Sequence, residues 1–343
     1  MTTAYLTDDS FTQHNHPQHP EHAGRIEAVW QALGAAGLSD QLRQIRPTPA
    51  SDEQILAVHT REHLERLVAV SQGDRLVRLD PDTYALPASY DAARLAAGAV
   101  IGAVDAVLST QADNALAIVR PPGHHATTDR QMGFCLLNNI AIAARQAQSR
   151  HGFDKVLILD YDVHHGNGTN DIFYADPSVL FISLHQYPHY PGSGALNEVG
   201  EDEGRGATIN IPLPAGHGDA SYRELFTEIV VPAIERFQPD LMLISAGFDA
   251  HFADPLASMQ LTLAGYDYLA RECIKQAERL CEGRIVFVME GGYHLTALAH
   301  GWSNIARALL DKDEISDPYG SPQSGINSDI QSLIGQLRQI HRF

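Results

Sequence analysis

Residues 156–168 read Val156-Leu157-Ile158-Leu159-Asp160-Tyr161-Asp162-Val163-His164-His165-Gly166-Asn167-Gly168. The first four are continuously apolar, which is typical of a strand buried on both faces of a sheet. Polar residues then alternate, so Asp160, Asp162 and His164 project to the same side while the chain stays extended. This stretch predicts an α/β protein with a polar site at the carboxyl end of a parallel strand.

Similar short apolar runs recur along the chain, and helix-like stretches separate them. The predicted strands are 115–119, 156–159, 179–184, 241–245 and 285–289, and the predicted helices are 92–108, 139–148, 222–237, 263–280, 298–310 and 326–340. No repeat or low-complexity linker divides the chain. The sequence therefore predicts one domain over residues 1–343, a mostly parallel sheet with helices on both faces.

The two ends of the chain differ from this pattern. Residues 1–24 are rich in His, Pro and Asp, and we expect an irregular loop at the rim of the site. Its histidines follow no helical or strand spacing, so a polar surface loop is favoured over a metal site; they are His14, His16, His19 and His22. Residues 316–343 predict a loop and an amphipathic helix, which packs on its own domain or on a partner chain. The apolar stripe of that helix comprises Ile330, Leu333, Ile334, Leu337 and Ile340.

Composition excludes several classes of protein. Asp and Glu number 42 against 24 Lys and Arg, a net charge of −18, which argues against a nucleic-acid binder and is compatible with cationic substrates. No apolar run approaches the ~20 residues of a membrane span, and the first residues do not resemble a signal peptide. Only three cysteines occur, too scattered for a disulfide framework or a CxxC zinc site. A cytoplasmic protein is expected.

Polar motifs follow three more of the predicted strands. They are Arg120-Pro121-Pro122-Gly123-His124-His125, Ala246-Gly247-Phe248-Asp249 and Glu290-Gly291-Gly292-Tyr293. The carboxyl ends of parallel strands meet at one edge of a sheet, so these motifs predict a single pocket. The adjacent imidazoles of His124 and His125 suit proton transfer, and the phenol of Tyr293 suits donation to an oxyanion. A pair of turn histidines and a core tyrosine are the structural alternatives.

The strongest candidate for a metal site is Asp162 and His164, with Asp249 from another strand end. Two carboxylates and one imidazole leave a coordination position open, which is the pattern of a catalytic site rather than a structural one. The alternative is a pair of capping aspartates beside a core histidine. It is less favourable because three such buried groups are hard to satisfy without a cation.

With these motifs, the chain resembles zinc-dependent histone deacetylases, in the superfamily that includes class II histone deacetylases, bacterial deacetylase-like amidohydrolases and acetylpolyamine amidohydrolases. The resemblance runs from His19 to Tyr293. Besides the strand-end motifs, it rests on Gly133-Phe134-Cys135, Asn138-Asn139 and Ser183-Leu184-His185. It implies the arginase-like α/β fold.

The resemblance also implies roles at the centre of the site. Asp162, His164 and Asp249 would hold one zinc ion, with iron(II) as a substitute. His125 would be the general base and then the general acid, and His124 an electrostatic partner. Tyr293 would polarise the acetyl carbonyl. Tyr293 is retained here, unlike in class IIa enzymes, so real deacetylase activity is expected.

Further roles are implied around this centre. Asp160 would orient His124, and Asn167 stands where class I enzymes place an Asp, which should lower the pKa of His125. The implied substrate-binding residues are Gly133, Phe134, Tyr190, Leu256, Asp82 and Gly292. One or two structural potassium ions are implied too, with the ligands Asp160, Asp162, His164, Ser183 and Leu184.

The choice of substrate depends on two positions. Leu256 stands where polyamine deacetylases carry a gatekeeper Glu, and no long insertion lies between Leu79 and Leu86. Asp82 aligns with the residue that grips substrate backbone amides, although a turn carboxylate is an equal alternative. An acyl-lysine peptide or protein is therefore favoured over N-acetylated polyamines or other small acetylated amines. A non-catalytic metal or small-molecule binding module, a binuclear arginase-like hydrolase and a homo-oligomer stay open.

Overall fold

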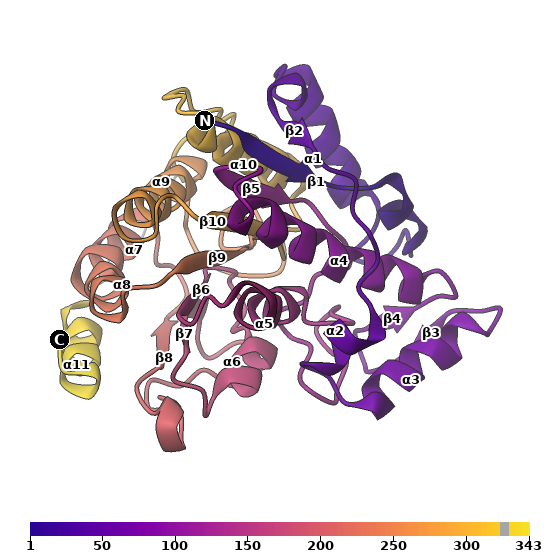
Figure 1. Cartoon of the computed structure of the whole chain (residues 1–343). Coiled ribbons are helices and arrows are strands. Elements are labelled where there is room, and N and C mark those ends of the chain that lie inside the picture. Colours follow the sequence, from indigo (N-terminus) through magenta and orange to yellow (C-terminus); the bar gives the residue numbers. More distant parts are fainter. Residues whose placement is uncertain (323–328) are drawn as a thin grey trace.

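The computed structural model describes residues 1–322 and 329–343 and is built around an eight-stranded sheet in which every pairing is parallel (Figure 1). The strand order is β2-β1-β5-β10-β9-β6-β7-β8. The strands are β1 (Thr3–Leu6), β2 (Arg43–Gln44), β5 (Asn114–Ala117), β6 (Val156–Asp160), β7 (Val179–Gln186), β8 (Thr208–Leu213), β9 (Leu241–Ala246) and β10 (Ile285–Met289). The predicted α/β class and all five predicted strands are confirmed. A small antiparallel ribbon of β3 (Val77–Arg78) and β4 (Tyr84–Ala85) lies outside the sheet.

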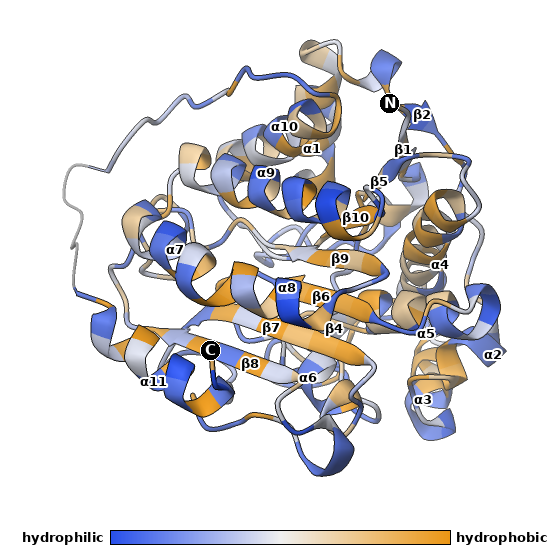
Figure 2. Ribbon diagram, turned by 60° about the vertical axis from the view of Figure 1, so that its left-hand side comes forward, coloured by the Kyte–Doolittle hydropathy of each residue, from blue (hydrophilic) through white to orange (hydrophobic). Residues whose placement is uncertain are grey.

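Helices cover both faces of the sheet (Figure 2). One face carries α2 (Asp52–Leu56), α3 (Arg61–Ser71), α4 (Ser89–Leu108), α5 (Asn139–His151) and α6 (Asn167–Phe173). The other carries α1 (Gly24–Ala35), α7 (Asp219–Leu225), α8 (Val231–Phe237), α9 (Leu263–Leu280) and α10 (Leu295–Leu309). The three-layer arrangement leaves the carboxyl edge of the sheet to the loops that carry the polar motifs.

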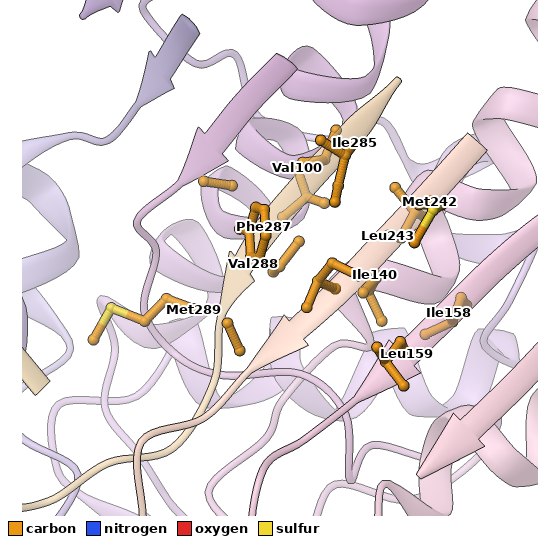
Figure 3. Packing of buried hydrophobic residues seen from close by; sticks show 14 of the residues in the cluster. Val100, Ile140, Ile158, Leu159, Met242, Leu243, Ile285, Phe287, Val288 and Met289 are labelled. Carbon is orange, nitrogen blue, oxygen red and sulfur yellow. The ribbon is translucent and has the colours of Figure 1, made fainter. Parts of the chain in front are cut away.

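The core lies between the central strands and the helices on each face. Every residue of β6, β9 and β10 is buried, and Val100 of α4 and Ile140 of α5 pack over them (Figure 3). Burying an aliphatic side chain of this size stabilises a fold by about 1.5–3 kcal/mol. The central strands are thus fully buried, and they end directly at the site.

The predicted helix over residues 222–237 is interrupted. It comprises α7, a π-helical turn (Phe226–Val230) and α8. Pro232 lies in the first turn of α8, where its missing N–H is tolerated, but it cannot donate to the preceding turn. The apolar periodicity continues through the interruption, which is why the pattern alone predicted a single helix.

The prediction for residues 1–24 is wrong in part. Thr3–Leu6 forms β1, an inner strand that pairs with both β2 and β5, and a 3-10 helix (Asp9–Gln13) follows it. Four residues are too short for a pattern to identify, and the strand forms because two neighbours complete its hydrogen bonds.

The C-terminal helix α11 (Gln331–His341) packs on its own domain, against the π-helical turn. The first residues of the predicted helix, 326–328, lie outside the described residues. Within the predicted stripe, Ile334 and Leu337 are buried, whereas Ile340 is 38% exposed. The predicted apolar stripe therefore packs against the domain except at its last residue, Ile340. Among the described residues, no helix is both long and apolar enough to cross a bilayer.

Candidate active site

Four neighbouring strands bring the polar motifs to one edge of the sheet. β5, β10, β9 and β6 are consecutive in the sheet and parallel. The loops that follow them carry His124 and His125, Tyr293, Asp249 and Asp162, respectively. The single pocket predicted from the four strand ends is therefore what the topology produces.

Asp162, His164 and Asp249 meet at this edge of the sheet. One ligand atom from each lies within 4.8 Å of the others. His164 Nδ1 is 3.2 Å from both Asp162 Oδ1 and Asp249 Oδ2, and both carboxylates are fully buried. Backbone N–H groups fix the two carboxylates, because Asp162 Oδ2 accepts from Gly291 and Asp249 Oδ1 accepts from Val163. The three predicted metal ligands are thus brought together and oriented.

These residues fit a divalent cation by their chemistry and their packing. In the described part of the chain, the ion-pair partners of the two carboxylates are histidines rather than Lys or Arg. Burial and the charge of Asp162 raise the pKa of Asp249, which shows the cost of two carboxylates in one dry site. Glycines allow the close approach, because a Cβ at Gly247 or Gly291 would lie 2.1 Å from a carboxylate oxygen. Two oxygens and one imidazole nitrogen are a suitable donor set for zinc.

Two adjacent imidazoles stand beside the metal cluster, each held through Nδ1. His124 Nδ1 is 2.9 Å from Asp160 Oδ2, and His125 Nδ1 is 2.8 Å from Asn167 Oδ1. The amide oxygen of Asn167 accepts, so the proton of His125 resides on Nδ1. The Nε2 lone pair of His125 is then free to take a proton. Asp160 and Asn167 lie where the resemblance implied.

The two imidazoles differ in charge. Burial alone would lower the pKa of His124, but the carboxylates of Asp160, Asp162 and Glu290 outweigh it and raise the pKa to about 10. Burial and the neighbouring imidazoles of His124 and His164 hold the pKa of His125 well below its usual value. His125 is therefore a neutral acceptor beside a cationic His124.

Tyr293 follows β10 and lines the same cavity as His125 and His164. The guanidinium of Arg25 lies 4.9 Å from the centre of its ring, and the ring of Phe134 meets it edge-on at 5.7 Å. Burial raises the pKa of Tyr293 well above its usual value, so its hydroxyl remains a proton donor at neutral pH.

A narrow cavity of about 200 Å³ connects these groups to the surface. It is lined by Asp82, His125, Gly133, Phe134, His164, His189, Tyr190, Leu256 and Tyr293. Gly133 (φ +55°) has room for no side chain, because a Cβ there would lie 2.3 Å from the His125 ring. Larger hollows exist on the surface, but this one is lined by His125, Tyr293 and the metal-ligand candidate His164.

A model of the histone deacetylase domain matches residues 19–309, which is most of the chain. The chain belongs to the histone deacetylase family. It is accordingly a deacetylase or amidohydrolase of that family, and the predicted family, fold and enzyme class are confirmed.

Relatives from three kingdoms support the assignment. Chloroplastic histone deacetylase 14 of Arabidopsis thaliana is 41% identical over 90% of this chain and 77% of that protein. A probable deacetylase of Archaeoglobus fulgidus is 43% identical over 93% and 89%. A histone deacetylase-like amidohydrolase of Pseudomonas aeruginosa is 45% identical over 81% and 72%. The solved HDA15 HD domain superimposes with a TM-score of 0.90 and 36% identity, over 99% of this chain and 94% of that one.

One residue expected to bind substrate lies elsewhere. Gly292 does not line the cavity, and its carbonyl accepts from Arg25 Nε at 2.8 Å behind Tyr293. It has a φ of +114°, which an L side chain rarely adopts. Gly292 therefore shapes the turn that presents Tyr293. Asp82 lines the cavity, whereas Asp80 is the turn carboxylate, which accepts from the N–H groups of residues 82 and 83.

The expectation of a polar surface loop is wrong for His14. It is 1% exposed, and its Nε2 lies 3.5 Å from Glu21 Oε2. Glu21 in turn pairs with the buried guanidiniums of Arg120 and Arg25. A buried arginine in the Arg-Pro-Pro-Gly-His-His motif needs an anion, and the N-terminal segment folds inward to supply it. The loop is part of the wall behind the site.

Sequence reasoning missed several residues that support this deacetylase site. Glu290 accepts the N–H groups of Gly123 and His124 and so joins β10 to the histidine loop. His189 stacks on His164, with ring centres 5.2 Å apart. The sequence did offer a signal for Glu290, because a polar residue directly after a buried strand is expected at the polar edge of the sheet. His189 lies in a loop without periodicity, and nothing in the sequence distinguished it.

Proposed function

We propose that this chain is a zinc-dependent deacetylase that removes acetyl or other short acyl groups from lysine side chains. One observation carries the proposal. His164 of the metal-binding cluster lines the same cavity as the neutral imidazole of His125 and the protonated phenol of Tyr293, with Asp162 and Asp249 directly behind it. Those are the parts that metal-assisted amide hydrolysis requires.

Asp162, His164 and Asp249 would hold the zinc ion, and iron(II) has the same ligand preferences. Bound zinc supplies Lewis acidity, which polarises a carbonyl and acidifies water. His125 takes a proton from the attacking water at Nε2 and later returns it to the leaving amine. The cationic His124, fixed by Asp160, favours the negative charge that develops beside it.

Tyr293 donates its hydroxyl hydrogen to the substrate carbonyl as that oxygen gains negative charge. The side chain of an acylated lysine lies between Phe134 and Tyr190, and the Gly133 carbonyl accepts from the scissile amide N–H. Asp82 at the mouth accepts backbone N–H groups of a peptide. These assignments are part of the proposal and follow the lining of the cavity.

The wall of the cavity supports lysine over polyamine. Leu256 lines the wall with an apolar side chain, and the nearby carboxylate of Asp254 is turned away to accept backbone N–H groups. Asp82 is the one carboxylate among the described lining residues. Deacetylation of N-acetylated polyamines is the second candidate, since a net charge of −18 attracts cationic amines.

A structural potassium ion beside the zinc is also proposed. Asp160 and Ser183 are paired across β6 and β7, next to the metal cluster. Asp162, His164 and Leu184 complete the proposed set. A cytoplasmic location remains a prediction from the sequence, and the oligomeric state stays open.

The experiment compares kcat/KM for an acetyl-lysine peptide, longer acyl-lysine peptides and N-acetylated polyamines. The proposal expects the acetyl-lysine peptide to be preferred. It also expects Tyr293→Phe to lower kcat by about 10²–10³-fold while zinc binding is retained. A much larger kcat/KM for the polyamines would establish the second candidate. Ligand binding without acetate release would identify a non-catalytic binding module.

A further inference from the structure

Asp254 is a buried carboxylate that bonds only to the backbone. It is 6% exposed and lies in the loop between β9 and α9. Its Oδ2 accepts the N–H groups of Tyr293 at 2.6 Å and His294 at 2.9 Å, and its Oδ1 accepts the N–H of Leu256 at 3.0 Å. Within the described ranges, no Lys or Arg forms an ion pair with it. Three backbone hydrogen bonds are therefore what satisfies this carboxylate in the interior.

The residues that Asp254 joins belong to two separate walls of one cavity. Leu256 and Tyr293 both line the cavity, although they are distant in sequence and follow different strands. The carbonyl of Leu256 accepts from His189 Nε2 at 3.0 Å, so its loop is fixed on a second side. Asp254 is the direct connection between this wall and the backbone of Tyr293.

Tyr293 is held by contacts at its ring and, separately, by the bond of its backbone N–H to Asp254. Arg25 lies over the ring and bonds to the carbonyl of Gly292, and Phe134 meets the ring edge-on. Ring contacts resist tilting of the phenol, but they do not fix its distance from the metal cluster. The preceding turn is held separately, because the Gly291 N–H bonds to Asp162 Oδ2 and the Gly292 carbonyl accepts from Arg25. The N–H of Tyr293 itself bonds to Asp254, which holds the tyrosine backbone where the turn ends.

We infer that Asp254 is a positioning residue that fixes the Tyr293 phenol against the metal cluster and the Leu256 wall. The inference rests on the proposed function, because it assigns a role within that reaction. An asparagine at this position has one acceptor oxygen. If that oxygen faces Tyr293, the amide NH₂ meets the N–H of Leu256, and donors oppose each other. Asp254→Asn therefore loosens one of the two walls without altering a metal ligand.

The first test measures kcat, KM and zinc content of Asp254→Asn with an acetyl-lysine peptide. A displacement of the phenol by about 1 Å is expected to lower kcat by about 10²-fold, with KM changed less than about threefold. One zinc per chain is expected to remain. The matched control is Asp219→Asn, because Asp219 accepts the N–H of Thr262 at 2.9 Å but does not touch Tyr293. The control is expected to keep kcat within about threefold of wild type.

The second test is a double-mutant cycle, which a merely structural role would not satisfy. If Asp254 acts through the phenol, Asp254→Asn should lower kcat further by less than about threefold once Tyr293→Phe is present. A full, multiplicative loss in the double variant would overturn the inference, and so would loss of zinc from Asp254→Asn. Wild-type kcat in Asp254→Asn would overturn it while leaving the proposed function intact. Absence of amide hydrolysis by zinc-loaded wild type would instead overturn the proposed function.

Discussion

Asn167 influences the charge of the His125 imidazole, which lines the cavity. Its neutral oxygen accepts the Nδ1 proton of His125 at 2.8 Å. A carboxylate at the same place would favour the imidazolium through its charge. The amide thus fixes the tautomer of His125 without adding to its basicity, and burial keeps the ring neutral.

Asn167→Asp is therefore expected to raise the pKa of His125. The base would become protonated at a higher pH, so the acid limb of the pH profile of kcat/KM should move upward by about 1–2 pH units. The measurement is kcat/KM for an acetyl-lysine peptide between pH 5 and 9. Asn197→Asp adds the same charge at an exposed position and should leave the profile in place. An unchanged acid limb in Asn167→Asp would show that His125 is not the base.

Residue by residue, the sequence predicted the reacting groups better than their supports. Asp162, Asp249 and Tyr293 follow buried apolar strands, so alternation and parallel topology place them together. The supporting roles of Glu21 and Asp254 were not predicted, because their partners are backbone groups or residues distant in sequence, such as Arg120. Local pattern carries no information about contacts of that kind.

At the scale of elements, His59 and His63 clamp the segment that forms the wall of the cavity. Their rings stack with centres 4.2 Å apart at the start of α3. His59 Nδ1 donates to the carbonyl of Thr127, and its Nε2 accepts the N–H of Asn138. The second bond requires the neutral ring, because a protonated Nε2 cannot accept. Burial, with the neighbouring His63, lowers the pKa of His59 to about 3, and burial lowers the pKa of His63 to about 4.

This pair predicts a loss of stability in acid. Below a pH of about 6.5 the unfolded chain binds protons on these imidazoles and the folded chain does not. The free energy of unfolding should therefore be fully retained above pH 6.5 and fall toward pH 4, by about 1.4 kcal/mol per pH unit for each histidine.

The measurement is urea unfolding of wild type and His63→Gln at several pH values. In His63→Gln, the free energy of unfolding should fall less steeply between pH 6.5 and 4, by the contribution of one histidine, about 1.4 kcal/mol per pH unit. His16→Gln, a partly exposed histidine, serves as the control. Identical slopes for wild type and His63→Gln would refute the linkage.

The helix α11 provides a second prediction at this scale. Leu337 is fully buried and Ile340 is 38% exposed, although the same stripe predicted both as buried. Leu337→Ala should lower the free energy of unfolding by about 2–4 kcal/mol, because it leaves a cavity. Ile340→Ala should change it by less than about 0.5 kcal/mol. Equal effects in urea unfolding would show that α11 does not pack as described.

Strands with a strong apolar pattern of their own could be predicted from the sequence. Strands that form only by pairing with a neighbouring strand could not. β10 was predicted with its correct bounds, since five apolar residues buried on both faces need no context. β8 has Thr208, Asn210 and Pro212 within six residues, and it forms because β7 offers it an edge. Whether such a segment forms a strand depends on the strand beside it.

At the scale of the whole molecule, the sheet converts four separate motifs into one site. The order β5-β10-β9-β6 places the histidine loop, the tyrosine turn and the two carboxylate loops side by side. The net charge of −18 counts Asp162 and Asp249 as free anions, although a bound divalent cation would offset them. With that cation bound, the site would be much less negative than the composition indicates.

The central claim is that amide hydrolysis depends on one metal ion held by Asp162, His164 and Asp249. The most direct measurement titrates metal-free protein with zinc and follows acetate release from an acetyl-lysine peptide. Activity should rise linearly and level off at one zinc per chain, and Asp249→Asn should neither bind zinc tightly nor regain activity. Full activity in the metal-free protein, or a requirement for two ions per chain, would contradict the account.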